Sequence, residues 1–244
     1  MSETTQGAGT QAAGTQAAGT QAANRTVRDI GILVVITLAA GMLLGAAYTV
    51  TKEPIARAQQ AAREQAQRAV MEDAAAFMPL AEDAGELTDL IQTALEEKGL
   101  ANTRVEQVDL AQDGEGRTTG YVVTCTNSEG YGGDVELMCG IVPGEDGTLT
   151  IEGISFLSLT ETAGMGMRAK DEEFISKFDG VQIRGDEALV YTKSGASAEN
   201  EIDAISGCTV TTSAVTKDVN AALEAVRTVL ASDGAIGAAA EGEA

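Results

Sequence analysis

Residues 203–215 read Asp-Ala-Ile-Ser-Gly-Cys-Thr-Val-Thr-Thr-Ser-Ala-Val, a hydroxyl-rich turn that leads into an apolar-periodic helix predicted over 214–230. The first turn of a helix carries backbone N–H groups without intrahelical partners, and hydroxyl side chains beside them suit a phosphate group. Ser206, Thr209 and Thr211 could instead cap the helix, since Ser and Thr commonly accept hydrogen bonds from its first N–H groups. The pattern by itself leaves both interpretations open.

The composition limits the chemistry that the chain can perform. Its 244 residues include 37 Asp and Glu against 16 Lys and Arg, for a formal net charge of -21, and there is no His. So acidic a surface repels polynucleotides, and we expect no nucleic-acid partner. Without His there is no imidazole ligand and no Ser-His-Asp relay, and neither Cys nor carboxylates stand at metal-ligand spacing. We therefore expect no metal and no catalytic side chain, and any redox chemistry would need a cofactor.

An uncharged apolar stretch over 30–50 predicts a membrane span. About 20 apolar residues in a helix cross the hydrocarbon core of a bilayer, so we expect a transmembrane helix over 29–50. A cleaved signal peptide is the rival interpretation, because residues 46–47 supply small side chains for cleavage. The stretch is longer than the usual core of a signal peptide and begins far from the N-terminus, which favours an uncleaved anchor.

Patterning in the remainder predicts a mixed α+β architecture, with helices followed by a strand meander and a final helix. The expected helices cover 54–77, 86–98, 171–178 and 214–230, and the expected strands cover 120–126, 135–142, 149–159 and 188–191. The division that follows is a disordered low-complexity tail over 1–28, the transmembrane helix over 29–50, a helical linker region over 51–98, a single folded domain over 99–230 and a disordered tail over 231–244.

The first predicted hairpin raises a question about two cysteines. A hairpin centred on Gly132 would place Cys125 directly opposite Cys139. Cross-strand neighbours are close enough for contact, although a disulfide demands particular geometry. The two residues are either bonded or simply small buried side chains.

A second glycine-containing stretch, 160–166, reads Thr-Glu-Thr-Ala-Gly-Met-Gly and follows a predicted strand. By itself it indicates only a flexible turn. Together with 203–209, however, it resembles the FMN-binding subunits of the Rnf and Nqr redox complexes. Residues 203–209 resemble their flavinylation site, Asp-x-x-Ser/Thr-Gly-Ala-Thr, with Cys208 in place of Ala and Thr209 as the final Thr.

Two further elements extend this resemblance. Residues 161–166 are similar to a Glu-Thr-Pro-Gly-Leu-Gly loop of the family, with Ala163 and Met165 in place of Pro and Leu. The Gly-Tyr-Gly-Gly run at 130–133 matches an element that precedes this loop, although a tight hairpin turn explains it equally well. The resemblance covers roughly 30–230, and the exit from the membrane at 51–55 is more similar to the G subunits of Rnf complexes than to the C subunits of Nqr complexes.

The resemblance implies an electron-transfer subunit that carries FMN through a phosphoester bond made by a separate flavin transferase. Thr209 would hold the FMN phosphate, and the glycines would allow the backbone to approach the ring. The remaining expected FMN-binding residues are Ser206, Gly207, Asp203, Thr211, Glu161, Thr162, Gly164, Gly166 and Tyr131. The partners implied are the other membrane and redox subunits of an Rnf-type complex, which couples ferredoxin/NAD electron transfer to ion translocation, so the activity would belong to the complex.

The resemblance also implies a cytoplasmic N-terminus and an FMN domain on the extracytoplasmic side of the cell membrane. The charges flanking the span disagree, because more basic residues follow it than precede it. Two alternative functions stay open. One is a non-redox extracytoplasmic binding or assembly module on a membrane anchor, and the other is a different anchored FMN reductase, such as a relative of the Nqr C subunits.

Overall fold

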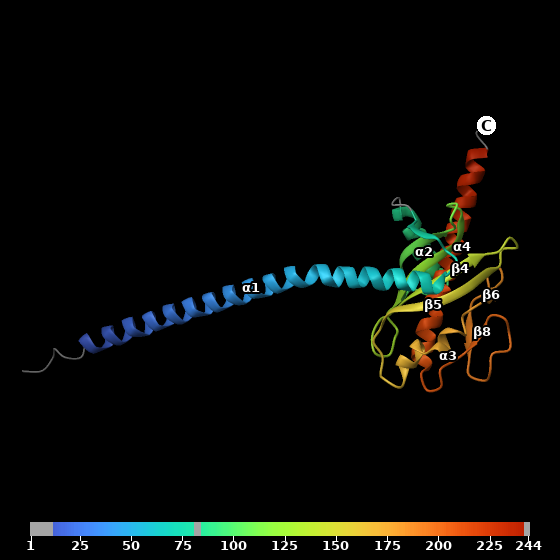
Figure 1. The fold of residues 1–244 in the computed structure, drawn as a ribbon. Coiled ribbons are helices and arrows are strands. Elements are labelled where there is room, and N and C mark those ends of the chain that lie inside the picture. The colour runs from blue at the N-terminus through green and yellow to red at the C-terminus, as the bar shows by residue number, and fades with distance from the viewer. Residues whose placement is uncertain (1–11, 81–83, 242–244) are drawn as a thin grey trace, which may run out of the picture. The chain divides into compact units, whose positions relative to one another are not determined.

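The structure, a computed structural model, describes residues 12–80 and 84–241. The chain divides into two compact units, Met1–Gln59 and Gln60–Ala244. The first unit consists of the greater part of helix α1, Ala12–Val70 (Figure 1). From Ile30 onward α1 is long and apolar enough to cross a membrane, and its large apolar side chains up to Val50 are exposed. The expected apolar span is thus an uninterrupted helix.

The second unit is built on an antiparallel six-stranded meander whose strands pair in chain order (Figure 1). A parallel pair of short strands, β7 and β8, forms a separate small sheet. The strands are β1 Ala76–Pro79, β2 Thr103–Gln112, β3 Thr118–Asn127, β4 Val135–Pro143, β5 Leu149–Leu159, β6 Val181–Ile183, β7 Val190–Thr192 and β8 Glu201–Asp203. The helices after α1 are α2 Ala84–Glu97, the 3-10 helix η1 Gly166–Lys170, α3 Glu172–Ile175 and α4 Thr209–Glu241.

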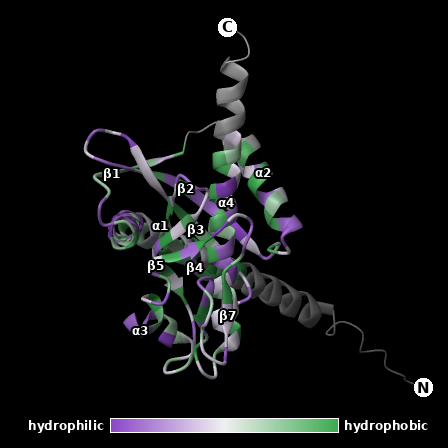
Figure 2. Ribbon diagram, turned by 90° about the vertical axis from the view of Figure 1, so that its right-hand side faces the viewer, coloured by the Kyte–Doolittle hydropathy of each residue, from purple (hydrophilic) through white to green (hydrophobic). Residues whose placement is uncertain are grey.

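Two hydrophobic clusters hold this unit together, one on each face of the meander. The larger places α2 and the apolar face of α4 against the strands, and Figure 2 shows hydrophobic residues gathered where α4 crosses β3 and β4. The smaller packs Ala66 and Val70, near the end of α1, against Val122 and Met138. A Cβ on Gly140 would lie 2.1 Å from the carbonyl oxygen of Val70, so only glycine allows the helix to approach the strand this closely.

The second unit begins earlier than the sequence analysis expects. Residues 60–98, expected in a helical linker, belong to the compact unit and supply β1 and α2. The helix expected over 54–77 is also wrong at both ends: α1 runs through Pro54 and stops at Val70, and 76–79 form a strand. A proline inside a helix removes one N–H donor and crowds the preceding turn, yet α1 continues through Pro54. At 76–79, pairing of β1 with β2 outweighs local helix propensity. Strand β2 itself was not predicted.

Both terminal helices extend into the ranges expected to be disordered. α1 begins at Ala12, within the expected tail over 1–28, and α4 continues to Glu241, within the expected tail over 231–244. Residues 1–11 and 242–244 lie outside the described residues. α4 also begins at Thr209, earlier than the predicted start at 214, because the hydroxyl-rich turn is itself the first part of the helix.

The expected pairing of Cys125 with Cys139 is wrong by two residues. In the β3–β4 ladder Cys125 pairs with Leu137, and Cys139 pairs with Val123. Both cysteines are free and buried. The loop between these strands turns one position earlier than a hairpin centred on Gly132 requires, and a shift of the centre by one residue moves each partner by two.

Candidate functional site

The turn before α4 is shaped by its own backbone and by one threonine. Gly207 has a φ of 80°, a left-handed conformation that glycine adopts without strain. Thr212 Oγ1 accepts a hydrogen bond from Ile205 N at 3.2 Å and donates one to the carbonyl oxygen of Cys208 at 2.9 Å. Thr212 therefore joins the turn to the helix. The capping interpretation expects this role of Ser206, Thr209 or Thr211 instead.

The threonines of this first stretch of α4 differ in what their hydroxyls contact. Thr211 is 2% exposed, and its Oγ1 donates a hydrogen bond to Glu161 Oε1 at 3.0 Å. Thr209 is half-buried, and no residue in the described ranges forms a hydrogen bond with its hydroxyl. Among the described threonines Thr209, Thr211 and Thr212, only Thr209 has a hydroxyl without a hydrogen bond. It lies at the N-terminus of α4, where the unpaired backbone N–H groups and the helix dipole favour an anion.

A hollow of ≈ 290 Å³ opens beside Thr209 and brings together segments that are distant in the sequence. It lies between the β3–β4 turn, the loop after β5 and the start of α4. Its lining is Tyr131, Glu161, Thr162, Met165, Gly166, Gly207, Cys208, Thr209, Val210 and Thr211. Most of the residues expected at the site from the sequence therefore line one hollow.

Three expected residues lie elsewhere. Ser206 lines a separate hollow beside Arg168 and Lys177. Asp203 is in β8, where its carboxylate accepts a hydrogen bond from the backbone of Ala196 at 2.8 Å. Gly164 does not line the hollow; it has a φ of 76° and allows the loop to turn. Asp203 and Gly164 thus serve the backbone of neighbouring loops, and Ser206 contributes to a different hollow.

The side chains that sequence reasoning missed are mainly apolar. Met165 and Val210 are 51% and 48% exposed, and with Tyr131 at 75% they form an apolar rim around Thr209. Cys208, at 7% exposed, contributes a buried part of the lining. Small-molecule sites combine such apolar surface with few polar groups. Met165 and Val210 are single apolar residues in their segments, and such residues carry little signal in a sequence.

Glu161 joins the segments around the hollow. Its Oε1 accepts hydrogen bonds from Tyr131 N at 2.9 Å and from Thr211 Oγ1 at 3.0 Å. A Cβ on Gly166 would lie 2.7 Å from Glu161 Oε2 and 2.8 Å from Thr211 Oγ1, so the loop passes directly over the carboxylate. One partly buried carboxylate thus ties the β3–β4 turn to the first turn of α4.

The β3–β4 turn has a second attachment to α4. Glu129 forms an ion pair with Lys217 and accepts a hydrogen bond from Asn102 Nδ2 at 2.6 Å. The hydrogen bond from Lys217, followed by that from Asn102, lowers the pKa of the Glu129 carboxyl. Tyr131 is therefore held near Thr209 by contacts on both sides of the turn.

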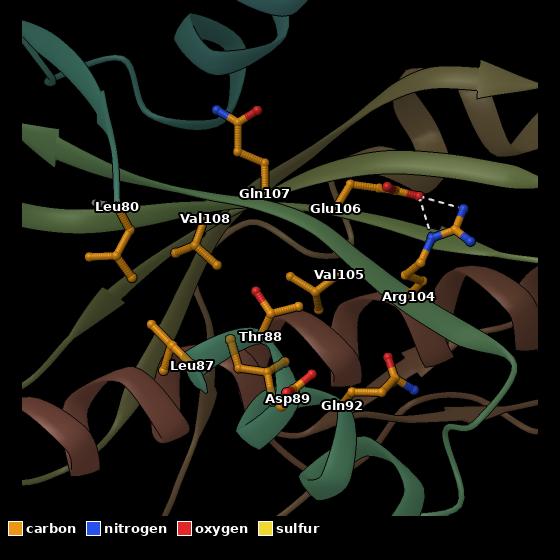
Figure 3. Close-up of a pocket in the computed structure, with 11 residues that line it drawn as sticks. Leu80, Leu87, Thr88, Asp89, Gln92, Arg104, Val105, Glu106, Gln107 and Val108 are labelled. Carbon is orange, nitrogen blue, oxygen red and sulfur yellow. Dashed lines mark hydrogen bonds and ion pairs between the residues drawn. The ribbon is translucent and has the colours of Figure 1, made fainter. Parts of the chain in front are cut away.

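Larger hollows occur in the same unit but carry none of the motif residues. One of ≈ 510 Å³ lies between α2 and β2, where Leu80, Leu87 and Val108 form an apolar floor beside the Arg104–Glu106 ion pair (Figure 3). Another, of ≈ 850 Å³, is lined by several carboxylates. Within the described ranges no group of three or more His, Cys, Asp or Glu could hold a metal ion. We assign the site to the smaller hollow because it combines a free hydroxyl, a helix N-terminus and an apolar rim.

Comparison with known proteins gives the class of this domain. Residues 130–224 match the FMN-binding domain family, and this range contains the whole lining of the hollow. This range is thus similar to FMN-binding domains, and it lies in an α+β unit that follows an apolar N-terminal helix.

Curated relatives of the chain are G subunits of ion-translocating oxidoreductases. The chain is 37% identical over 118 residues to the G subunit of the proton-translocating ferredoxin:NAD(+) oxidoreductase complex of Clostridium ljungdahlii, covering 48% of this chain and 58% of that protein. It is 34% identical over 109 residues to the Na(+)-translocating counterpart of Acetobacterium woodii, covering 45% and 50%. It is 29% identical over 194 residues to the G subunit of the ion-translocating oxidoreductase complex of Methanosarcina acetivorans, covering 80% and 90%.

Solved structures with some likeness are NqrC proteins. NqrC of Shewanella oneidensis matches with a TM-score of 0.37 and 23% identity, covering 47% of this chain and 53% of that one. The C subunit of the Na(+)-translocating NADH-quinone reductase of Parabacteroides distasonis matches with a TM-score of 0.42 and 21% identity, covering 64% and 77%. The chain spans about half the length of the first curated relatives, 58% and 50%. It is a relative of the G subunits, as the resemblance of its motifs indicates.

Proposed function

We propose that this chain is a membrane-anchored electron-transfer subunit that carries FMN bound covalently, through its phosphate, to Thr209. The observation that carries the proposal is the free hydroxyl of Thr209, which lies at the N-terminus of α4 inside the matched FMN-binding domain. The hydroxyls of the two neighbouring threonines, Thr211 and Thr212, are hydrogen-bonded and buried, and the exposed Ser206 does not line the hollow.

The residues around Thr209 fit such a group. The N–H groups of the first turn of α4 would bind the phosphate oxygens, and Gly207 has open space where a side chain would stand. Tyr131, Met165 and Val210 offer apolar surface to a planar ring, and the exposed Thr162 offers a polar contact at its edge. Bound FMN would supply the transfer of one or two electrons, while the chain's own residues hold and orient it.

The bond requires an activated flavin donor. The Thr209 oxygen would form a new bond to phosphorus, and joining it to FMN itself would require hydroxide to leave. A flavin dinucleotide avoids this, because its anhydride P–O bond breaks, a nucleoside monophosphate leaves, and the hydroxyl proton passes to a base. That base would belong to a separate flavin transferase, since the described residues place no free acid or base within hydrogen-bonding distance of the Thr209 hydroxyl.

The setting follows from the relatives and from α1. The curated relatives are subunits of ferredoxin:NAD(+) oxidoreductase complexes that translocate protons or Na(+). Our proposal therefore includes other membrane and redox subunits of an Rnf-type complex as partners, with the activity residing in the complex. It also places α1 in the cell membrane with a cytoplasmic N-terminus and the FMN domain on the extracytoplasmic side, where lost free FMN could not readily be replaced.

Replacement of Thr209 tests the proposal. The full chain is coexpressed with a flavin transferase, and intact mass and flavin fluorescence after denaturation report covalent FMN. Thr209→Ala and Thr209→Val should abolish the attachment, whereas Thr209→Ser keeps a hydroxyl and should retain part of it. Val closely matches Thr in shape, so a folded Thr209→Val protein controls for packing.

Two outcomes would contradict the proposal. A wild-type chain that carries no covalent flavin under these conditions would favour a non-redox binding or assembly module. Flavin that persists in folded Thr209→Ala protein and maps by peptide fragmentation to Thr211 would leave the family intact and make the site wrong.

A further inference from the structure

The hollow contains two threonine hydroxyls at the start of α4, and the flavin motif alone does not explain why only one should be modified. Thr209 and Thr211 both line it. Residues two apart on a helix point in different directions, at about 100° per residue, yet the loop after β5 folds over both. Something in the tertiary structure must distinguish them.

The structure distinguishes them through the carboxylate of Glu161. Thr211 Oγ1 donates its hydrogen bond to Glu161 Oε1 at 3.0 Å and is almost fully buried, whereas Thr209 has no such contact. The same oxygen of Glu161 accepts a hydrogen bond from the backbone N–H of Tyr131 at 2.9 Å. Gly166 crosses so close that a Cβ would touch Glu161 Oε2 and Thr211 Oγ1. Thr211 is thus enclosed by the carboxylate and the loop.

We infer that Glu161 determines which threonine receives the flavin, by holding Thr211 buried and keeping phosphate away from it. This inference rests on the proposed attachment of FMN and assigns Glu161 a positioning role in the modification. A negative carboxylate in contact with Thr211 Oγ1 repels an incoming phosphoryl group, which carries negative charge itself. Burial of Thr211 also blocks the in-line approach that phosphoryl transfer requires.

A hydrogen bond to a carboxylate could in principle activate Thr211 as a nucleophile. Its burial argues against this role, because the oxygen must reach the phosphorus of a donor presented by another protein. At Thr209, in contrast, the hydroxyl is half-buried and can be reached. The Thr209 oxygen would form the bond to phosphorus, the anhydride bond of the flavin dinucleotide would break, a nucleoside monophosphate would leave, and the proton would pass to a base of the transferase.

The test uses the full chain coexpressed with a flavin transferase, with attachment sites located by peptide fragmentation. Glu161→Gln keeps the shape and removes the charge, and Glu161→Ala removes the contacts as well. We expect the ratio of FMN on Thr209 to FMN on Thr211 to fall roughly tenfold or more in either variant, the change that loss of one charge-assisted hydrogen bond produces. Glu152→Gln, which changes an exposed carboxylate away from the hollow, should leave the ratio unchanged.

A second arm uses a protein that lacks the proposed acceptor. Thr209→Ala should carry no covalent FMN, whereas Thr209→Ala with Glu161→Gln should regain FMN on Thr211. This gain of modification cannot result from unfolding. One result would overturn the inference alone: the wild type is labelled at Thr209, and the Glu161 variants are folded, fully labelled at Thr209 and never labelled at Thr211. Absence of covalent flavin from the wild type would instead overturn the proposed function.

Discussion

Asp218 lies in the core of the second unit, on the face of α4 that packs against β3 and β4, and its replacement by Asn should stabilise the protein. The side chain is fully buried, and neither carboxylate oxygen has a hydrogen-bond partner. Its surroundings include the buried thiols of Cys125 and Cys139, whose pKa values are themselves raised, chiefly by burial. Burial raises the pKa of Asp218 from 3.8 to about 9.

The sign of the effect follows from proton uptake. Between about pH 4 and pH 9 the unfolded chain has lost the Asp218 proton and the folded chain retains it, so the free energy of unfolding falls by about 1.4 kcal/mol per pH unit. At pH 7 the free energy of unfolding is lower by about 4 kcal/mol, because the pH has risen from the ordinary Asp pKa of 3.8 to 7. Above the folded-state pKa the carboxylate ionises in both states, and the cost no longer grows.

An asparagine at this position would have nearly the same shape as protonated Asp and no charge. Asp218→Asn should therefore raise the free energy of unfolding by about 3–4 kcal/mol at pH 7, by more at pH 8.5, and by little at pH 4.5. The Asn amide would lack a hydrogen-bond partner, as the protonated Asp218 carboxyl does. The cost of an unpaired buried polar group is therefore similar in the two proteins and largely cancels. Urea unfolding of the full chain in detergent, followed by circular dichroism at these pH values, measures the change.

The control is Glu152→Gln, which neutralises an exposed carboxylate of the same unit and should leave the pH dependence of wild type unaltered. If Asp218→Asn and wild type unfold at the same urea concentration at both pH 4.5 and pH 8.5, Asp218 is not held protonated in the fold. The reasoning from burial would then be refuted.

Two further predictions concern the anchor and the sheet. Because the apolar part of α1 is exposed and uninterrupted, the protein should stay with membranes after alkaline extraction, and a mature N-terminus directly after Ala47 would show a cleaved signal peptide instead. Gly140→Ala should lower the free energy of unfolding by about 1–3 kcal/mol, because its Cβ would lie 2.1 Å from the Val70 carbonyl oxygen. Gly153→Ala, at the position paired with Gly140 in β5, adds a Cβ that comes no closer than 3.4 Å to its neighbours, and an equal loss in both variants would show that close packing is not the cause.

Much of the fold could be predicted because its signals are local. The apolar stretch over 30–50, the β-branched runs of β3 and β4 and the periodicity of α4 depend on side-chain spacing along one element. β2 escaped prediction because its sequence, Thr-Arg-Val-Glu-Gln-Val-Asp-Leu-Ala-Gln, is mostly polar. Its pairing with β1 and β3 comes from the rest of the sheet.

The candidate site was predicted in its residue types and only partly in its arrangement. Matching motifs pointed to Thr209, Glu161 and Tyr131, and the structure places all three around one hollow. The same motifs included Asp203 and Ser206, which lie outside it, because a sequence motif also contains residues that shape the backbone. Two residues of the apolar rim, Met165 and Val210, were missed, since single apolar residues in a turn carry little signal by themselves.

By itself the sequence determined the apolar span, the strands β3 to β5, and the hydroxyl-rich stretch that precedes the apolar face of α4, because each depends on neighbours within a few residues. The tertiary structure decided which hydroxyl stays free. Glu161 and Thr211 are 50 residues apart, and only packing of the loop after β5 on α4 joins them through a hydrogen bond. It also decided the burial of Asp218 and the ladder position of Cys139. These features depend on contacts between distant segments, which local spacing does not encode.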